Sequence, residues 1–128
     1  MKQAQPTKGV VTTSVRTPDD LAGRLQAQGW KVGIVSGAPT KAEALDAIGK
    51  ALDFPSYYGK NLDALTDCLR DLEAPTALIW VGWEPFAVQA ASDWGKLVTV
   101  LSDRVAEEGT PFSALFCVGA PEADRPSS

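Results

Sequence analysis

The apolar stretch at residues 76–83 is the feature of the sequence that most constrains the fold. Its sequence, TALIWVGW, is typical of a strand covered on both faces in a parallel sheet. Two further strands are predicted at residues 30–35 and 112–118, and segments with helical periodicity separate all three. Strands that alternate with helices are joined by right-handed crossovers. The sequence therefore predicts the α/β class: a small three-stranded parallel sheet, with residues 76–83 as its central strand and helices packed against it.

Capping residues predict where three of the helices begin. Each of these helices has, just before or at its start, a residue whose hydroxyl can accept a backbone hydrogen bond. In chain order these residues are Thr17, Thr40 and Ser92. Glu43 completes a capping box at the second helix, which is expected to end before Pro55. Residues 84–91 fit either a short helix or an irregular crossover.

The chain is expected to form one domain with unstructured ends. Residues 1–16 are polar and are predicted to be a flexible N-terminal arm, with a few valines that hint at a short strand. Residues 17–118 form the predicted domain, in which 17–29 are an extra N-terminal helix that covers one face of the sheet. Residues 119–128, rich in proline and serine, are predicted to be a disordered tail.

Composition predicts a cytoplasmic protein that binds neither a membrane nor a nucleic acid. The N-terminus has no apolar stretch of signal-peptide length, and no apolar run could span a bilayer. Cys68 and Cys117 are too few for a disulfide framework and are expected to be reduced thiols. The formal net charge of −4, from 16 acidic and 12 basic residues, argues against an anionic partner and is compatible with a basic one.

The absence of histidine lowers the expectation of an enzyme. It removes the commonest general base and the usual imidazole metal ligand. We therefore expect no catalytic residues, no cofactor and no bound metal.

Residues 54–72 concentrate negative charge on one predicted helix. Proline and glycine predict a tight turn at residues 55–59, where the glycine takes a backbone angle closed to other residues. The helix that follows has an apolar stripe on one face, and Asp63, Asp67 and Asp71 line the opposite, exposed face. Like charges four residues apart repel each other, so folding does not require this arrangement. A helix face that carries unfavourable charges without a structural gain is more often functional than an average protein surface.

The motif YYGKNLDALTDCL, which begins at Tyr57, resembles the signature of the barstar family. Members of this family are small intracellular proteins that inhibit secreted ribonucleases of the barnase type. A looser resemblance extends from about residue 30 to residue 118 and leaves out the first 29 residues and the tail. The resemblance implies a barstar-like fold, monomeric when free, whose acidic helix blocks a cationic active site with a carboxylate in place of a substrate phosphate.

The resemblance also implies roles for individual residues. Six of them are expected to bind the partner: Tyr57, Gly59, Asn61, Asp63, Thr66 and Asp67. Asp67 takes the phosphate position, and Asp63 pairs with a basic residue at the cleft. Tyr57 is the exposed tyrosine of the turn and packs on a catalytic side chain, whereas its neighbour points inward. Gly59 and Asn61 shape the contacting loop.

Departures from the family pattern predict a different cognate ribonuclease. Thr66 stands where the best-known member has a contacting tryptophan, and the tryptophan expected just after the helix is missing near Leu72. Arg104 stands where that member offers a glutamate. A cation beside a basic cleft lowers affinity, so Arg104 is expected to narrow the range of partners.

Two alternatives remain open from the sequence. The barstar-like domain could bind some other basic protein. Less favoured is a small acid-base or metal-dependent enzyme that uses Asp63 and Asp67, because paired carboxylates can hold Mg²⁺. Tight binding of a divalent metal would separate the enzyme from both binding proteins.

Overall fold

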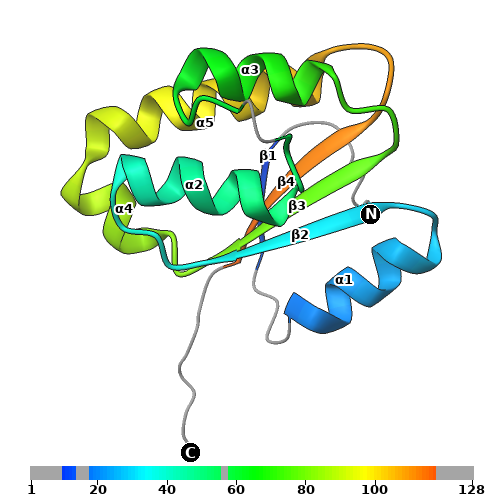
Figure 1. Ribbon diagram of the computed structural model, residues 1–128. Coiled ribbons are helices and arrows are strands. Elements are labelled where there is room, and N and C mark those ends of the chain that lie inside the picture. The colour runs from blue at the N-terminus through cyan, green and yellow to red at the C-terminus, as the bar shows by residue number, and fades with distance from the viewer. Residues whose placement is uncertain (1–9, 14–17, 56–57, 118–128) are drawn as a thin grey trace, which may run out of the picture.

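A computed structural model describes residues 10–13, 18–55 and 58–117, which form one parallel sheet with helices on both faces (Figure 1). In chain order the elements are β1 (Val10–Thr13), α1 (Pro18–Ala27), β2 (Lys31–Ser36), α2 (Lys41–Ala51), α3 (Leu62–Arg70), β3 (Thr76–Val81), α4 (Glu84–Gln89), α5 (Ala91–Ala106) and β4 (Phe112–Cys117). The predicted α/β class and the three parallel strands β2, β3 and β4 are confirmed.

The sheet also contains a fourth strand, so that its order is β1-β4-β3-β2. β1 pairs in parallel with β4, from Val10 opposite Ala114 to Thr13 opposite Cys117. The expectation of a flexible arm over residues 1–16 is therefore wrong for these four residues. Their sequence, VVTT, consists of β-branched residues that favour a strand, and pairing covers an edge of β4 that would otherwise be open. The rest of the expected arm lies outside the described residues.

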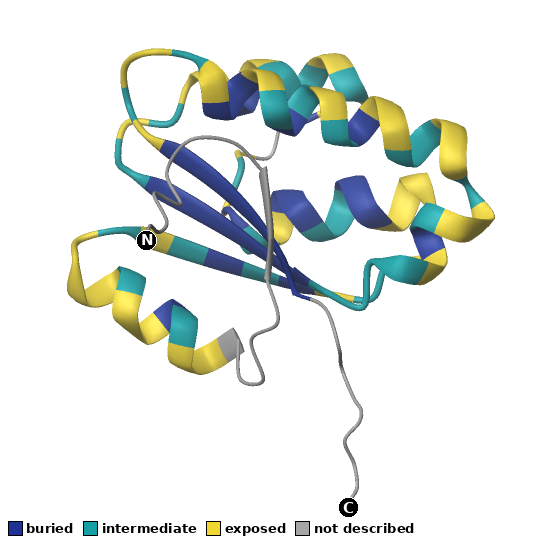
Figure 2. Cartoon of the chain, turned by 180° about the vertical axis from the view of Figure 1, so that it is seen from behind, coloured by how far each residue is buried: buried dark blue, intermediate teal, exposed yellow. Residues whose placement is uncertain are grey.

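The main core lies between the sheet and helices α2 to α5. β3 and β4 are the inner strands and are buried along almost their whole length (Figure 2). Trp80, at the centre of this core, is fully buried, and its indole Nε1 donates a hydrogen bond to Gly37 O at 2.9 Å. Residues 76–81 thus form a central strand, as predicted.

Among the described helices, α1 is the one that lies on the other face of the sheet (Figure 1). Its buried Ala22 packs with Ile79 of β3 and with Leu115 and Cys117 of β4. The extra N-terminal helix thus covers one face of the sheet, on the side opposite α3.

Element boundaries differ from the prediction at both ends of α4. β3 ends at Val81, because Gly82 turns the chain with φ +73°, and Trp83 precedes α4 instead of ending a strand. Residues 84–89 are a short helix, which settles the choice left open by the sequence. Ser92 does not cap α5, which already begins at Ala91. None of the described helices is long and apolar enough to cross a membrane.

Candidate functional site

Helix α3 carries the acidic residues and is fixed at its start by Asn61. The Asn61 side-chain oxygen Oδ1 accepts a hydrogen bond from Ala64 N at 2.8 Å, so Asn61 is the N-cap. Leu65, Cys68 and Leu69 are buried and hold one face of the helix against the core. The expected role of Asn61 in shaping the loop thus has a structural basis in capping.

Asp63, Asp67 and Asp71 form what we call the acidic ridge, on the outer side of α3. All three side chains are exposed. Among the described residues, none of the three carboxylates takes part in a salt bridge. Asp63 lies in the first turn, where the helix dipole favours a negative charge, but Asp71 is the C-cap, where the dipole opposes it. Among the described residues, the ridge therefore presents to the solvent negative charge that no salt bridge neutralises.

The turn before α3 is anchored by Tyr58. Its backbone N–H donates to Pro55 O at 2.9 Å, and its hydroxyl donates to Leu45 O at 3.0 Å. A Cβ atom on Gly49 would lie 2.6 Å from the Tyr58 ring, so the ring needs a glycine beside it. Burial raises the pKa of Tyr58 from 10.0 to about 12. One tyrosine of the turn does point inward; Tyr57, expected to face the partner, lies outside the described residues.

The loop between this turn and α3 has a different backbone geometry from the one predicted. The left-handed conformation falls on Lys60, with φ +56°, and not on Gly59. The expectation that Gly59 takes a backbone angle closed to other residues was therefore wrong. A Cβ at Gly59 would lie 3.3 Å from Asn61 Nδ2, so a larger residue there would push the Asn61 side chain by a few tenths of an ångström.

Lys60 is held by a carboxylate on α2. Its Nζ lies 2.9 Å from Asp46 Oδ1, and Lys50 Nζ lies 3.1 Å from Asp46 Oδ2. Hydrogen bonds from Lys60 first and Lys50 second hold the pKa of Asp46 below its usual range. Sequence reasoning missed Asp46: its i, i+4 spacing from Lys50 was visible, but its contact with Lys60 needs the fold.

Thr66 lies on α3 but faces α5 rather than the solvent. Its side chain is partly buried, and its hydroxyl donates to Leu62 O at 2.9 Å. It lines a small cavity of ≈ 60 Å³ together with Val100 and Arg104 of α5. Thr66 therefore has less surface to offer a partner than the ridge carboxylates have.

Arg104 is buried, contrary to the expectation that it lies beside the partner's cleft and narrows the range of partners. Its side chain is 5% exposed. Nε donates to Leu69 O at 2.8 Å, and Nη2 donates to Thr110 O at 2.7 Å. A cation is favourable beside the last carbonyls of a helix, and here it ties the end of α3 to the loop after α5. The guanidinium group therefore stabilises the fold. Its burial could not be seen from the sequence.

Two further observations bear on the chemistry of the site. Within residues 10–13, 18–55 and 58–117, no group of three or more His, Cys, Asp or Glu side chains is arranged to hold a metal ion. Cys68 and Cys117 are free and buried, and burial raises the pKa of both thiols. The predicted free state of the thiols agrees with this arrangement.

Comparison with known proteins shows the family of the chain. Residues 34–117 match the family described as Barstar (barnase inhibitor). A stretch of 40 residues, 30% of the chain, is 48% identical to the Bacillus subtilis (strain 168) protein named "Putative ribonuclease inhibitor YrdF". The match covers 44% of that relative, which is less than half of its length. Because the match spans more than half of the chain and includes α3 with the whole acidic ridge, the chain belongs to the Barstar (barnase inhibitor) family.

Proposed function

We propose that the chain is a protein inhibitor of a ribonuclease and acts by inserting the acidic ridge into the enzyme's active-site cleft. The observation that carries the proposal is the exposed row of carboxylates on α3, which have no salt bridge among the described residues. A cleft that binds RNA must be cationic, because the phosphate backbone dominates the affinity of nucleic-acid binding. Membership of the family and the name of the Bacillus relative support the same function.

Asp67 is the residue that we propose to take the position of a substrate phosphate. It lies in the middle of the ridge, one helical turn from both Asp63 and Asp71. In this arrangement Asp63 pairs with a second basic group at the edge of the cleft. Tyr57, Gly59 and Asn61 complete the contact from the preceding loop, and Thr66 contributes at its border.

The partner that fits this surface is a basic, secreted, barnase-like ribonuclease. Opposite charges on the two proteins would steer their encounter, which makes the association rate fall as salt is added. We propose further that the inhibitor is cytoplasmic and monomeric when free. The free, buried thiols of Cys68 and Cys117 are compatible with a reducing compartment.

The proposal is tested by titrating purified chain into assays of secreted basic ribonucleases at two salt concentrations. We expect stoichiometric inhibition of at least one enzyme, with slower association at the higher salt. Binding to a basic protein without ribonuclease activity, and inhibition of none of the enzymes, would favour the alternative in which the fold serves another basic partner. Tight binding of Mg²⁺ at Asp63 and Asp67 would instead favour the enzyme alternative.

A further inference from the structure

Lys60 places a positive charge beside the surface that must meet a cationic cleft. It immediately precedes Asn61, the N-cap of α3, and stands three residues before Asp63. Its side chain is 58% exposed, so the ammonium group could extend toward a bound partner. If it did so, it would oppose the basic groups that the acidic ridge attracts.

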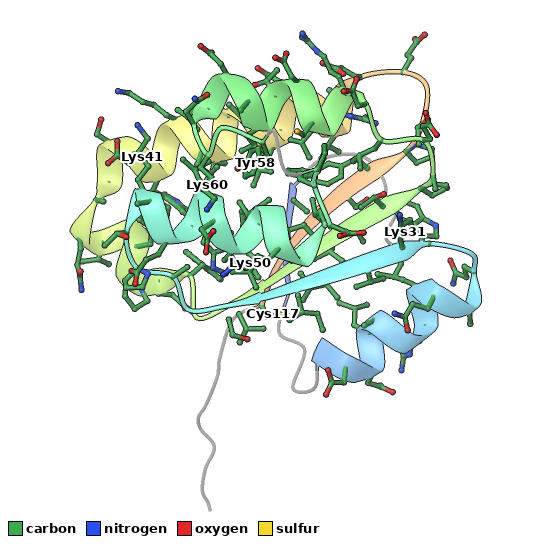
Figure 3. The ribbon with its side chains drawn as sticks, viewed as in Figure 1. Lys31, Lys41, Lys50, Tyr58, Lys60 and Cys117 are labelled. Atoms are coloured by element: carbon green, nitrogen blue, oxygen red, sulfur yellow. The ribbon has the colours of Figure 1, made fainter. Side chains whose placement is uncertain are left out.

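The structure directs this ammonium group elsewhere. Lys60 has a left-handed backbone, and its side chain reaches across to α2, the helix that carries Lys50 (Figure 3). Asp46 holds the two lysines separately, with Oδ1 2.9 Å from Lys60 and Oδ2 3.1 Å from Lys50. Asp46 is the more sheltered partner of the Lys60 pair, with 34% of its side chain exposed.

Neighbouring contacts on α2 hold the same loop. The Tyr58 hydroxyl reaches Leu45 O, one residue before Asp46, and the Tyr58 ring lies against Gly49. Figure 3 shows Tyr58 between α2 and α3. Helix α2 therefore fixes the loop at a buried point through Tyr58 and at a surface point through Lys60.

We propose that Asp46 is a positioning residue for inhibition, which holds Lys60 against α2 and keeps its charge away from the acidic ridge. This inference rests on the proposed function. It extends the functional surface to α2, which presents no residue to the cleft in that proposal. In this arrangement Asp46 acts through Lys60 and does not touch the ribonuclease.

A double-mutant cycle separates this role from a general effect of charge. Asp46→Asn should weaken inhibition roughly 2- to 5-fold, the range of an exposed ion pair. Lys60→Met should inhibit within about 2-fold of the unmodified chain, because the unwanted charge is gone. Adding Asp46→Asn to Lys60→Met should then have no further effect.

Lys50 supplies the matched control, because Asp46→Asn also releases this second lysine. In a Lys50→Met background, Asp46→Asn should still weaken inhibition as it does in the unmodified chain. The inference is overturned if Asp46→Asn weakens inhibition equally with and without Lys60, which is the signature of long-range charge alone. It is also overturned if Asp46→Asn has no effect in the unmodified chain.

A measurement on the free protein distinguishes failure of this inference from failure of the proposed function. Hydrogen exchange of the Lys60 and Asn61 amides should accelerate in Asp46→Asn and in Lys60→Met, but not in Lys50→Met. If exchange behaves so and no ribonuclease is inhibited, the proposed function fails and the positioning role fails with it. The other outcome is that the unmodified chain inhibits a ribonuclease but neither measurement shows coupling between Asp46 and Lys60. In that case this inference alone is wrong.

Discussion

The two sides of α3 place charged groups in opposite settings. On the outer side, Asp67 is exposed and has no salt bridge among the described residues. On the inner side, Arg104 is buried and donates to Leu69 O near the end of the helix. The family resemblance implied that Asp67 enters the partner's cleft and that Arg104 lies beside it. Burial therefore decides which charge stays accessible: Arg104 is used up by backbone carbonyls, whereas Asp67 remains exposed to the solvent.

The largest expected effect comes from reversing the buried charge. Arg104→Glu should lower the free energy of unfolding by about 3–5 kcal/mol, because a carboxylate would face the carbonyls of Leu69 and Thr110 without a partner. Denaturant unfolding measures this loss. If Arg104→Glu is stable and binds a barnase-type ribonuclease more tightly than the unmodified chain, then Arg104 faces the partner and this account is wrong.

Arg104→Met is the companion variant, which keeps the protein testable if Arg104→Glu does not fold. Methionine keeps much of the side-chain volume and contact with Phe112 but leaves the two carbonyls without their donor. Its loss of stability should be smaller than that of Arg104→Glu. An exposed counterpart, Arg24→Glu on α1, should change stability by only about 0.5 kcal/mol.

A pH titration tests the anchor of the loop. The pKa of Tyr58 is raised to about 12 by burial, so the folded chain keeps a proton that the unfolded chain loses near pH 10. Stability should therefore fall as pH rises from about 10 to about 12, by about 2–3 kcal/mol from this group. Tyr58→Phe should be less stable at neutral pH and should lack this part of the alkaline decline. The same decline in both proteins would show that Tyr58 is not the group responsible.

The smallest effect is expected from the thiols, which are buried, Cys68 on the inner face of α3 and Cys117 in β4. Replacing Cys68 and Cys117 together with alanine removes two buried sulfur atoms and should lower stability by about 1 kcal/mol at each position. Inhibition should be unchanged in the folded variant. A folded double variant that no longer inhibits would mean that the thiols contribute to recognition. The claim that only the exposed side of α3 binds the partner would then be wrong.

Most of the fold could be predicted from regular patterns in the sequence. The apolar run at residues 112–118 and the strand predicted at 30–35 each lie within one residue of β4 and β2. The valines of the short strand β1 gave only a hint of it, because four residues carry too weak a periodic signal and its formation depends on pairing with β4. Local patterns predict a helix or strand well when buried positions recur regularly along it. They predict it poorly when its formation depends on pairing with a segment far away in the sequence.

The site was less predictable for the same reason. The spacing of Asp63 and Asp67 on one helix face was visible in the sequence, and both are exposed. The fate of Arg104 depends on Leu69 O, 35 residues away, and the fate of Lys60 depends on Asp46 of another helix. Charges on a regular helix could be placed from spacing alone, whereas these long side chains required the tertiary structure.

The central claim is that the middle carboxylate of the exposed ridge takes the place of a phosphate. It is tested most directly by inhibition titrations with Asp67→Ala and Asp71→Ala, each checked for its free energy of unfolding. Asp67→Ala should weaken binding by about 2–5 kcal/mol, because it leaves the cations of the cleft buried and unpaired, and Asp71→Ala by less than about 1 kcal/mol. Both variants should be as stable as the unmodified chain or slightly more so, since each relieves repulsion between like charges. Equal losses of affinity for the two variants, or a loss explained by unfolding, would contradict the phosphate-mimic mechanism.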